Sequence, residues 1–261
     1  MTASIVSSRF AGFRPLVRRE LAEWRHSRRI VVIPVVMSLF MVLSAANSWI
    51  VSQVVANVPG AEAPDAPISL DPLQNLLAAV GSQIFVLAAI FATMSLLVGE
   101  RERGTLAWVA SKPVSRGAIW ASKALAGSAV VGLVAVVIPM AITTAVVAAI
   151  YGVPAIGPVL AITTGMVVLS ALFVVIGLAV STVVTSQAAV AAVGFAMFFV
   201  PALLLAIVPV DIEAFLPTSI LGWSVGLAMG APVGFATPVA WAVAMIVLVW
   251  VSVRGLERAE L

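Results

Sequence analysis

One stretch of this sequence is unusually long and free of charge. From Ala124 to Val210, 87 consecutive residues include no Asp, Glu, Lys or Arg. A helix needs about 20 apolar residues to cross the roughly 30 Å hydrocarbon core of a bilayer, and charged side chains are too costly near its centre to be scattered there. The stretch is therefore long enough for several membrane-spanning helices and is not the core of a water-soluble protein.

The amino-acid composition narrows the class of protein in the same direction. Hydrophobic residues make up 62% of the chain and charged residues 10%, against about 45–50% and about 25% in typical soluble domains. Disorder requires low hydrophobicity and high charge, so it is excluded as well. The absence of cysteine excludes a disulfide framework, cysteine-bound zinc, an iron–sulfur cluster and a thiol nucleophile. We expect an all-α, polytopic membrane protein with a segment 1–29 before one membrane domain, residues 30–261.

The charge-free stretches and the breaks between them predict six spans. Turn-like sequences at 151–154 and 181–187 divide the longest stretch into three. Asp71 as N-cap and Pro72 at the first helical position form a start signal for the second span. The expected spans are residues 30–51, 76–99, 125–150, 156–181, 188–209 and 236–253. Prolines that can bend a helix lie within three of these spans: Pro34, Pro139 and Pro201.

The distribution of charge predicts the topology. Of the 14 Lys and Arg residues, seven precede the first span, five lie between the second and third spans, and two lie near the C-terminal end. The opposite side receives only acidic residues, namely Glu62, Asp65, Asp71, Asp211 and Glu213. The positive-inside rule then places both termini and the segment 100–123 in the cytoplasm of a multi-pass cell-membrane protein. This orientation requires an even number of spans.

The segment before the first span has the pattern of an amphipathic helix. Its apolar residues recur at gaps of three and four: Phe10, Phe13, Val17, Leu21 and Trp24. Such a helix would lie on the inner leaflet with its arginines among anionic headgroups. Simple anchoring of the topology by positive charge explains the same residues equally well.

A glycine pattern precedes the last span. Glycines recur at four-residue spacing, as Gly222, Gly226, Gly230 and Gly234. One interpretation is ordinary close packing of helices through small residues. The other is a re-entrant or interfacial hairpin that closes a translocation route on the outer side, because irregular backbone at membrane depth must be buried in protein or line a cavity.

The charged segment between the second and third spans predicts a short helix at residues 105–111. Leu106 and Val109 lie on one face of it, Gly104 permits a turn into it, and Pro113 interrupts the chain after it. Ser115 is placed to cap the helix of the third span. A short helix joined to two spans would tilt both of them together when force is applied to it, although a passive interfacial helix has the same pattern.

This segment carries a family resemblance. The residues E-R-E-R-G-T-L-A-W-V-A-S-K-P-V-S-R, from Glu100 to Arg116, resemble a motif of the ABC-2 type permeases of ATP-binding cassette transporters. Ser122-Lys123 stands where that family has Gly-Lys, and Trp108-Val109-Ala110 replaces a leucine-rich part. The resemblance is strongest to the short permeases grouped with transporters for sodium efflux and for maturation of nitrous-oxide reductase.

The resemblance implies that this segment is a coupling helix that docks on a separate ATPase subunit, and that two permeases pair over an ATPase dimer. ATP and Mg would be bound by the partner subunit, so this chain would bind no cofactor. We refer to residues 100–116 as the coupling segment. The residues implied in contact with the ATPase subunit are Glu100, Arg101, Glu102, Arg103, Gly104, Thr105, Leu106, Val109, Pro113, Ser115 and Arg116.

Several other functions lack their chemistry in this sequence. There is no G-x-x-x-x-G-K-[ST] loop for ATP. No expected span carries an ionisable side chain, which disfavours a proton- or sodium-coupled carrier and a membrane enzyme. The basic residues follow the topology and do not indicate nucleic-acid binding. We expect no catalytic or metal site. The alternatives to an exporter's permease subunit are an ATP-independent channel or carrier, and a membrane scaffold that matures a partner enzyme.

Overall fold

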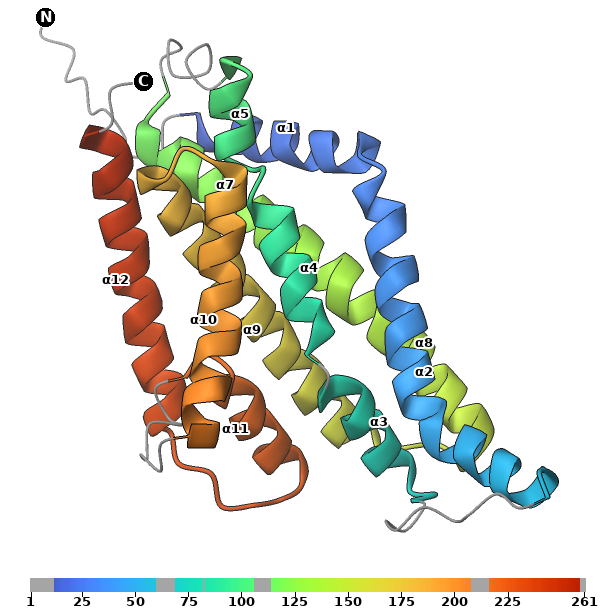
Figure 1. Ribbon diagram of the computed structural model, residues 1–261. Helices are drawn as coiled ribbons and strands as arrows, with labels where there is room; N and C mark the ends of the chain where they lie inside the picture. The colour runs from blue at the N-terminus through green and yellow to red at the C-terminus, as the bar shows by residue number, and fades with distance from the viewer. Residues whose placement is uncertain (1–11, 60–68, 82, 106–113, 208–215, 259–261) are drawn as a thin grey trace, which may run out of the picture.

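The computed structural model describes residues 12–59, 69–81, 83–105, 114–207 and 216–258, and all regular structure among them is helical. The long helices run side by side as a bundle, and α1 (Phe13–His26) lies across one end of it (Figure 1). The small helix α5 (Val98–Glu102) and the last described turns of α12 (Ala236–Arg258) lie at the same end. The bundle therefore gathers the basic parts of the described chain at one end.

Five helical stretches are long and apolar enough to cross a membrane. The first is α2 (Arg29–Asn57), and the second is formed by α3 (Pro72–Gly81), α4 (Ile84–Thr93) and α5. The third joins α7 (Arg116–Val131), a π-helical turn η1 (Gly132–Val137) and α8 (Ile138–Tyr151), and the remaining two are α9 (Ile156–Val183) and α12. These five confirm five of the predicted spans.

The span predicted at residues 188–209 coincides with α10 (Gln187–Ile207). The apolar stretch described there, Gln187–Val200, is shorter than a membrane span, as is α11 (Ser219–Ala228). The count of six spans therefore stays a prediction.

Two helix starts agree with the residues that the sequence assigned to them. The Asp71 carboxylate accepts hydrogen bonds from the backbone N–H groups of Leu73 and Gln74, at 2.8 and 2.9 Å. The Ser115 hydroxyl oxygen accepts one from the backbone N–H of Ala118 at 3.1 Å. Both caps satisfy N–H groups that have no partner inside the first helical turn.

The π-helical turn η1 lies immediately before Pro139 in the third span. Proline lacks a backbone N–H, and its ring collides with the carbonyl four residues earlier in a regular α-helix, here that of Ala135. A wider π turn makes room for the ring without ending the helix. The perturbation predicted at Pro139 thus takes the form of a locally widened helix.

Helix α9 is the centre of the bundle, since it contacts α4, α7, α10, α11 and α12. Two of its glycines allow neighbouring helices to approach closely. A methyl group at Gly177 would lie 2.5 Å from the Thr93 hydroxyl oxygen of α4, and one at Gly165 would lie 2.2 Å from the Ser224 hydroxyl oxygen of α11. Small residues thus set the helix spacing on two sides of α9.

Candidate functional site

The coupling segment begins as a direct continuation of the second span. Helix α5 ends at Glu102, and Gly104 has a φ of +68°, the left-handed conformation that glycine adopts without strain. The turn predicted at this glycine is therefore confirmed. Leu106, Val109 and Pro113 lie outside the described residues, so the short helix between them stays a prediction.

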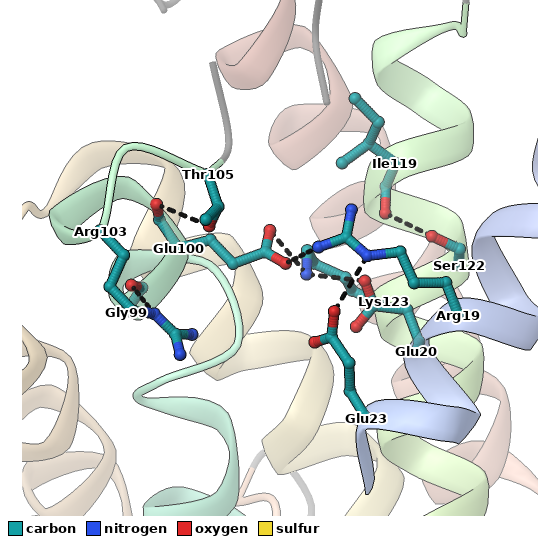
Figure 2. A network of polar contacts seen from close by, with 10 residues as sticks. All are labelled: Arg19, Glu20, Glu23, Gly99, Glu100, Arg103, Thr105, Ile119, Ser122 and Lys123. Atoms are coloured by element: carbon teal, nitrogen blue, oxygen red, sulfur yellow. Dashed lines mark hydrogen bonds and ion pairs between the residues drawn. The ribbon is translucent and has the colours of Figure 1, made fainter. Parts of the chain in front are cut away.

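Three charged side chains from three helices meet at the base of this segment. The ammonium group of Lys123 in α7 lies 2.9 Å from a carboxylate oxygen of Glu20 in α1 and 2.9 Å from one of Glu100 in α5 (Figure 2). All three residues are buried, with exposed fractions of 4% for Glu20, 3% for Glu100 and 2% for Lys123. One lysine therefore joins the N-terminal helix, the end of the second span and the start of the third.

Two more residues extend this group toward solvent. The guanidinium of Arg19 lies 2.9 Å from the Glu23 carboxylate and 3.4 Å from the second carboxylate oxygen of Glu100. Arg19 is about one-third exposed and Glu23 about half exposed, so the Arg19–Glu23 pair is screened by water. We call the five residues Arg19, Glu20, Glu23, Glu100 and Lys123 the ionic cluster (Figure 2).

Burial determines how much each member of the cluster contributes to the free energy of unfolding. Taking an ion out of water costs several kcal/mol, and removing one partner of a buried pair costs about 3–5 kcal/mol because the remaining charge is uncompensated. Burial raises the pKa of the Glu20 carboxyl above its ordinary value, and the nearby Lys123 ammonium opposes that rise. Lys123 is the critical member, because among the described residues its ammonium is the cation that contacts both buried carboxylates, each at 2.9 Å.

The three carboxylates invite a test for a metal site. Oxygen atoms of Glu20, Glu23 and Glu100 lie within 4.8 Å of one another. The Lys123 ammonium already lies at 2.9 Å from two of them, where a cation would have to bind. The two buried carboxylates are already paired with a cationic side chain of the chain itself, and we assign no metal to the cluster.

The other described residues of the coupling segment are held by separate contacts. Arg101 donates to the Ser181 carbonyl of α9 at 3.2 Å, and Arg116 donates to the Leu256 carbonyl of α12 at 3.0 Å. Further hydrogen bonds run from Gln187 to the Glu102 carboxylate, from Arg103 to the Gly99 carbonyl and from Thr105 to the Glu100 carbonyl. The outward-facing part of the segment comprises the exposed residues Glu102, Arg103 and Gly104.

Glu100 is a buried member of the coupling segment. The family resemblance groups it with residues that contact an ATPase subunit, and in the structure its carboxylate faces inward and is paired with Lys123 and Arg19. Its contact with an ATPase subunit stays a prediction. A pocket of about 660 Å³ opens beside Glu100, between α1, α5 and α7, and is lined by polar side chains that include Glu102, Arg103 and Gln187.

Sequence reasoning missed the ionic cluster, although signals for it were present. Glu20 recurs with Leu16 and Trp24 at a spacing of four, and these three are the buried residues of α1, whereas Leu21 of the predicted apolar face is exposed. Helix α1 therefore turns a face that contains a carboxylate toward α7. An acidic residue on such a face requires a cationic partner, and Lys123 at the start of an apolar span requires an anionic one.

The glycine pattern does not form one continuous helical face. Gly222 and Gly226 belong to α11, which ends at Ala228, and Gly230 has a φ of +70° in the turn that follows. The Trp223 indole N–H donates to the Gly234 carbonyl at 2.8 Å, so the chain folds back beside α11. The close approach of α11 to α9 depends on Gly165, outside this pattern. The gate suggested at these glycines stays a prediction.

Comparison with known protein families shows which family the chain resembles. The family model described as ABC-2 family transporter protein matches residues 14–218 of the chain. The chain belongs to the ABC-2 family. The matched range includes α1 except for Phe13, the coupling segment and every member of the ionic cluster, and it ends just before α11. This ABC-2 protein is thus a multi-pass membrane protein of transporter type and a non-catalytic permease by family. Among curated proteins, none matches this chain.

Proposed function

We propose that this chain is the permease subunit of an ATP-driven exporter, moved by an ABC ATPase subunit that contacts the coupling segment from the cytoplasm. The family match supports this proposal most strongly, because ABC-2 membrane proteins generally work with an ATPase partner and as membrane dimers. Two copies of the chain, or this chain and a second permease, would pair in the cell membrane with both termini in the cytoplasm. ATP and Mg would be bound by the partner.

The two described ends of the coupling segment support its proposed role. Helix α5 continues the second span, and α7 opens the third span under the Ser115 cap. The segment between them leaves exposed residues at Glu102–Gly104 while Glu100 is fixed below. A partner that presses on the exposed part would therefore displace two spans together, which is what coupling of ATP hydrolysis to transport requires.

Co-purification tests the partnership. The tagged chain, extracted from its native membrane in mild detergent, is expected to retain an ABC ATPase that mass spectrometry identifies. The ATPase activity of the reconstituted complex should respond to the permease. A chain that carries no ATPase and moves solute through liposomes without nucleotide would contradict the proposal in favour of a channel or carrier. A complex that binds partners without any transport would favour a scaffold.

Substitutions test the contact itself. The double substitution L106D/V109D places two charges on the face that the sequence predicts to meet the ATPase, so the complex should lose nucleotide-driven transport while the spans still fold. Asn57→Ala is a matched control, because Asn57 is an exposed polar residue at the far end of α2 whose side chain bonds only locally to the Gln53 carbonyl among the described contacts. Equal transport by the two variants would exclude the coupling segment as the contact.

A further inference from the structure

The N-terminal helix has a polar connection to the transport bundle that its amphipathic pattern does not require. A helix that only anchors the topology needs apolar contacts and exposed arginines. Helix α1 instead buries the Glu20 carboxylate on its packed face, at 2.9 Å from the Lys123 ammonium. Burying this carboxylate costs free energy that a leucine at position 20 would not cost. The pairing is therefore best explained by the geometry that it enforces.

The ammonium group of Lys123 also contacts the coupling segment. Lys123 contacts Glu100 at 2.9 Å, and Glu100 lies four residues before Gly104, the turn into the segment. Charge-assisted hydrogen bonds of this length are directional and strong when water is excluded. A displacement of α5 therefore pulls on Lys123, and Lys123 in turn pulls on α1.

Helix α1 passes such a displacement to the first span. Only Ser27 and Arg28 separate α1 from α2, and the Ser27 hydroxyl accepts a hydrogen bond from the Arg29 backbone N–H at 3.3 Å. The Arg29 guanidinium also donates to the Ser95 hydroxyl, just before α5. The first span is thus held to the end of the second span at two places, once through Lys123 and once through Arg29.

We propose that Lys123 is a positioning residue that includes α1 and the first span in the moving unit, so that a push on the coupling segment displaces three spans. Its ammonium group is shared by Glu20 and Glu100 and acts as the joint between the N-terminal helix and the segment. This proposal rests on the proposed function for the source of the push. The joint itself is a property of the chain alone.

The absence of cysteine in the chain makes the joint measurable by spin labels at introduced cysteines. Labels at the exposed positions Ala22 in α1 and Arg103, the residue after α5, report the distance between α1 and the segment in nanodiscs. Labels at the exposed positions Ile142 in α8 and Val168 in α9 serve as the reference pair, away from the cluster. Both pairs are expected to give narrow distance distributions in the otherwise unaltered chain.

The decisive variant is K123M/E20Q/E100Q, which removes the buried charges together and so leaves none uncompensated. It should widen the distance distribution between positions 22 and 103 by about twofold, because α1 then loses its buried ion pairs to α5 and α7, and leave the reference pair unchanged. Glu23→Gln is the matched control on the same helix, since Glu23 is about half exposed and, within the described part of the chain, its ion pair is with Arg19. An unchanged distribution in the triple variant would overturn the joint. Widening of the distance distributions of both label pairs would overturn the joint as well, because the whole bundle would then have loosened.

A second measurement in the complex with the ATPase tests the transmission. Addition of ATP should change the distance between labels at Ala22 and Val168, and the triple variant should reduce that change about fivefold while ATP hydrolysis persists. An equal change in the triple variant would overturn the proposal. If no ATPase accompanies the chain, the proposed function fails, but the nanodisc measurement still decides whether Lys123 joins α1 to the segment.

Discussion

The two ends of the bundle are held together by different physical means. At the end that carries the coupling segment, buried charges from α1, α5 and α7 meet at 2.9 Å. At the opposite end, the helices depend on close approach and on single hydroxyl groups, as between Gly165 and Ser224. Breaking a buried ion pair costs several times more than losing one neutral hydrogen bond. The comparison indicates that the charged end is built to move as a unit, while the other end can rearrange at lower cost.

The opposite end also contains the single tyrosine of the chain. The Trp49 backbone N–H donates to the Tyr151 hydroxyl at 2.8 Å, and that hydroxyl donates to the Ala45 carbonyl at 3.2 Å. These two backbone groups are four residues apart and would bond each other in a regular helix. The Tyr151 hydroxyl thus links α8 to α2 by bonding two backbone groups of α2. Without this hydroxyl, the Trp49 N–H can bond the Ala45 carbonyl within α2 itself.

The largest effect is expected from the single substitution Lys123→Met. It leaves the carboxylates of Glu20 and Glu100 buried without their cation, and should lower the free energy of unfolding by about 3–5 kcal/mol. Thermal unfolding in detergent measures the loss. The neutral variant K123M/E20Q/E100Q should recover most of the stability, because no charge is then left unpaired. Equal loss in both variants would show that packing around position 123, and not charge, holds this end together.

At the opposite end, Gly165→Ala tests the close approach of α11 to α9. The added methyl group would lie 2.2 Å from the Ser224 hydroxyl oxygen and 2.5 Å from its Cβ, so the helices must separate. We expect a loss of about 1–3 kcal/mol in the free energy of unfolding. Gly157→Ala on the same helix has no atom within 4 Å and should not be destabilising. The double variant G165A/S224G should restore stability, and failure to do so would contradict the close contact.

A smaller effect is expected from Tyr151→Phe. The variant keeps the ring and removes only the hydroxyl between Ala45 and Trp49, so the loss should be about 0.5–1 kcal/mol because the two backbone groups can bond each other. Thermal unfolding in detergent measures this loss as well. Destabilisation as large as that of Lys123→Met would contradict the proposed difference between the two ends.

The smallest effect concerns the dependence of stability on pH. Burial raises the pKa of Glu20 in the folded protein, so the folded state binds this proton more tightly than the unfolded chain does. The stabilising contribution of protonated Glu20 is complete below its ordinary pKa and is lost as pH rises through the raised pKa. The unfolding temperature of the original chain, measured relative to that of Glu20→Gln, should therefore fall across this interval. A rise in this difference would contradict the direction of the shift.

Sequence patterns predicted the apolar helices well and the polar contacts between them poorly. Caps such as Asp71 and Ser115, and the turn at Gly104, depend on neighbouring residues and were readable from the chain. The Glu20–Lys123 contact joins residues 103 positions apart, and its existence follows only from how α1 lies across α7. The pattern of α1 also indicated an apolar face one position away from the face that packs. Periodicity describes one helix at a time, whereas this site is made by three.

The widened turn in the third span separates the two ends just compared. In an α-helix each backbone N–H bonds the carbonyl four residues before it, which fixes the rotation of one turn relative to the next. In η1, over Gly132–Val137, the hydrogen bonds instead span five residues. The hydrogen-bond register of the third span therefore changes between its two halves. The orientation of α8 about the helix axis, at the end away from the ionic cluster, is set separately from that of α7, which carries Lys123.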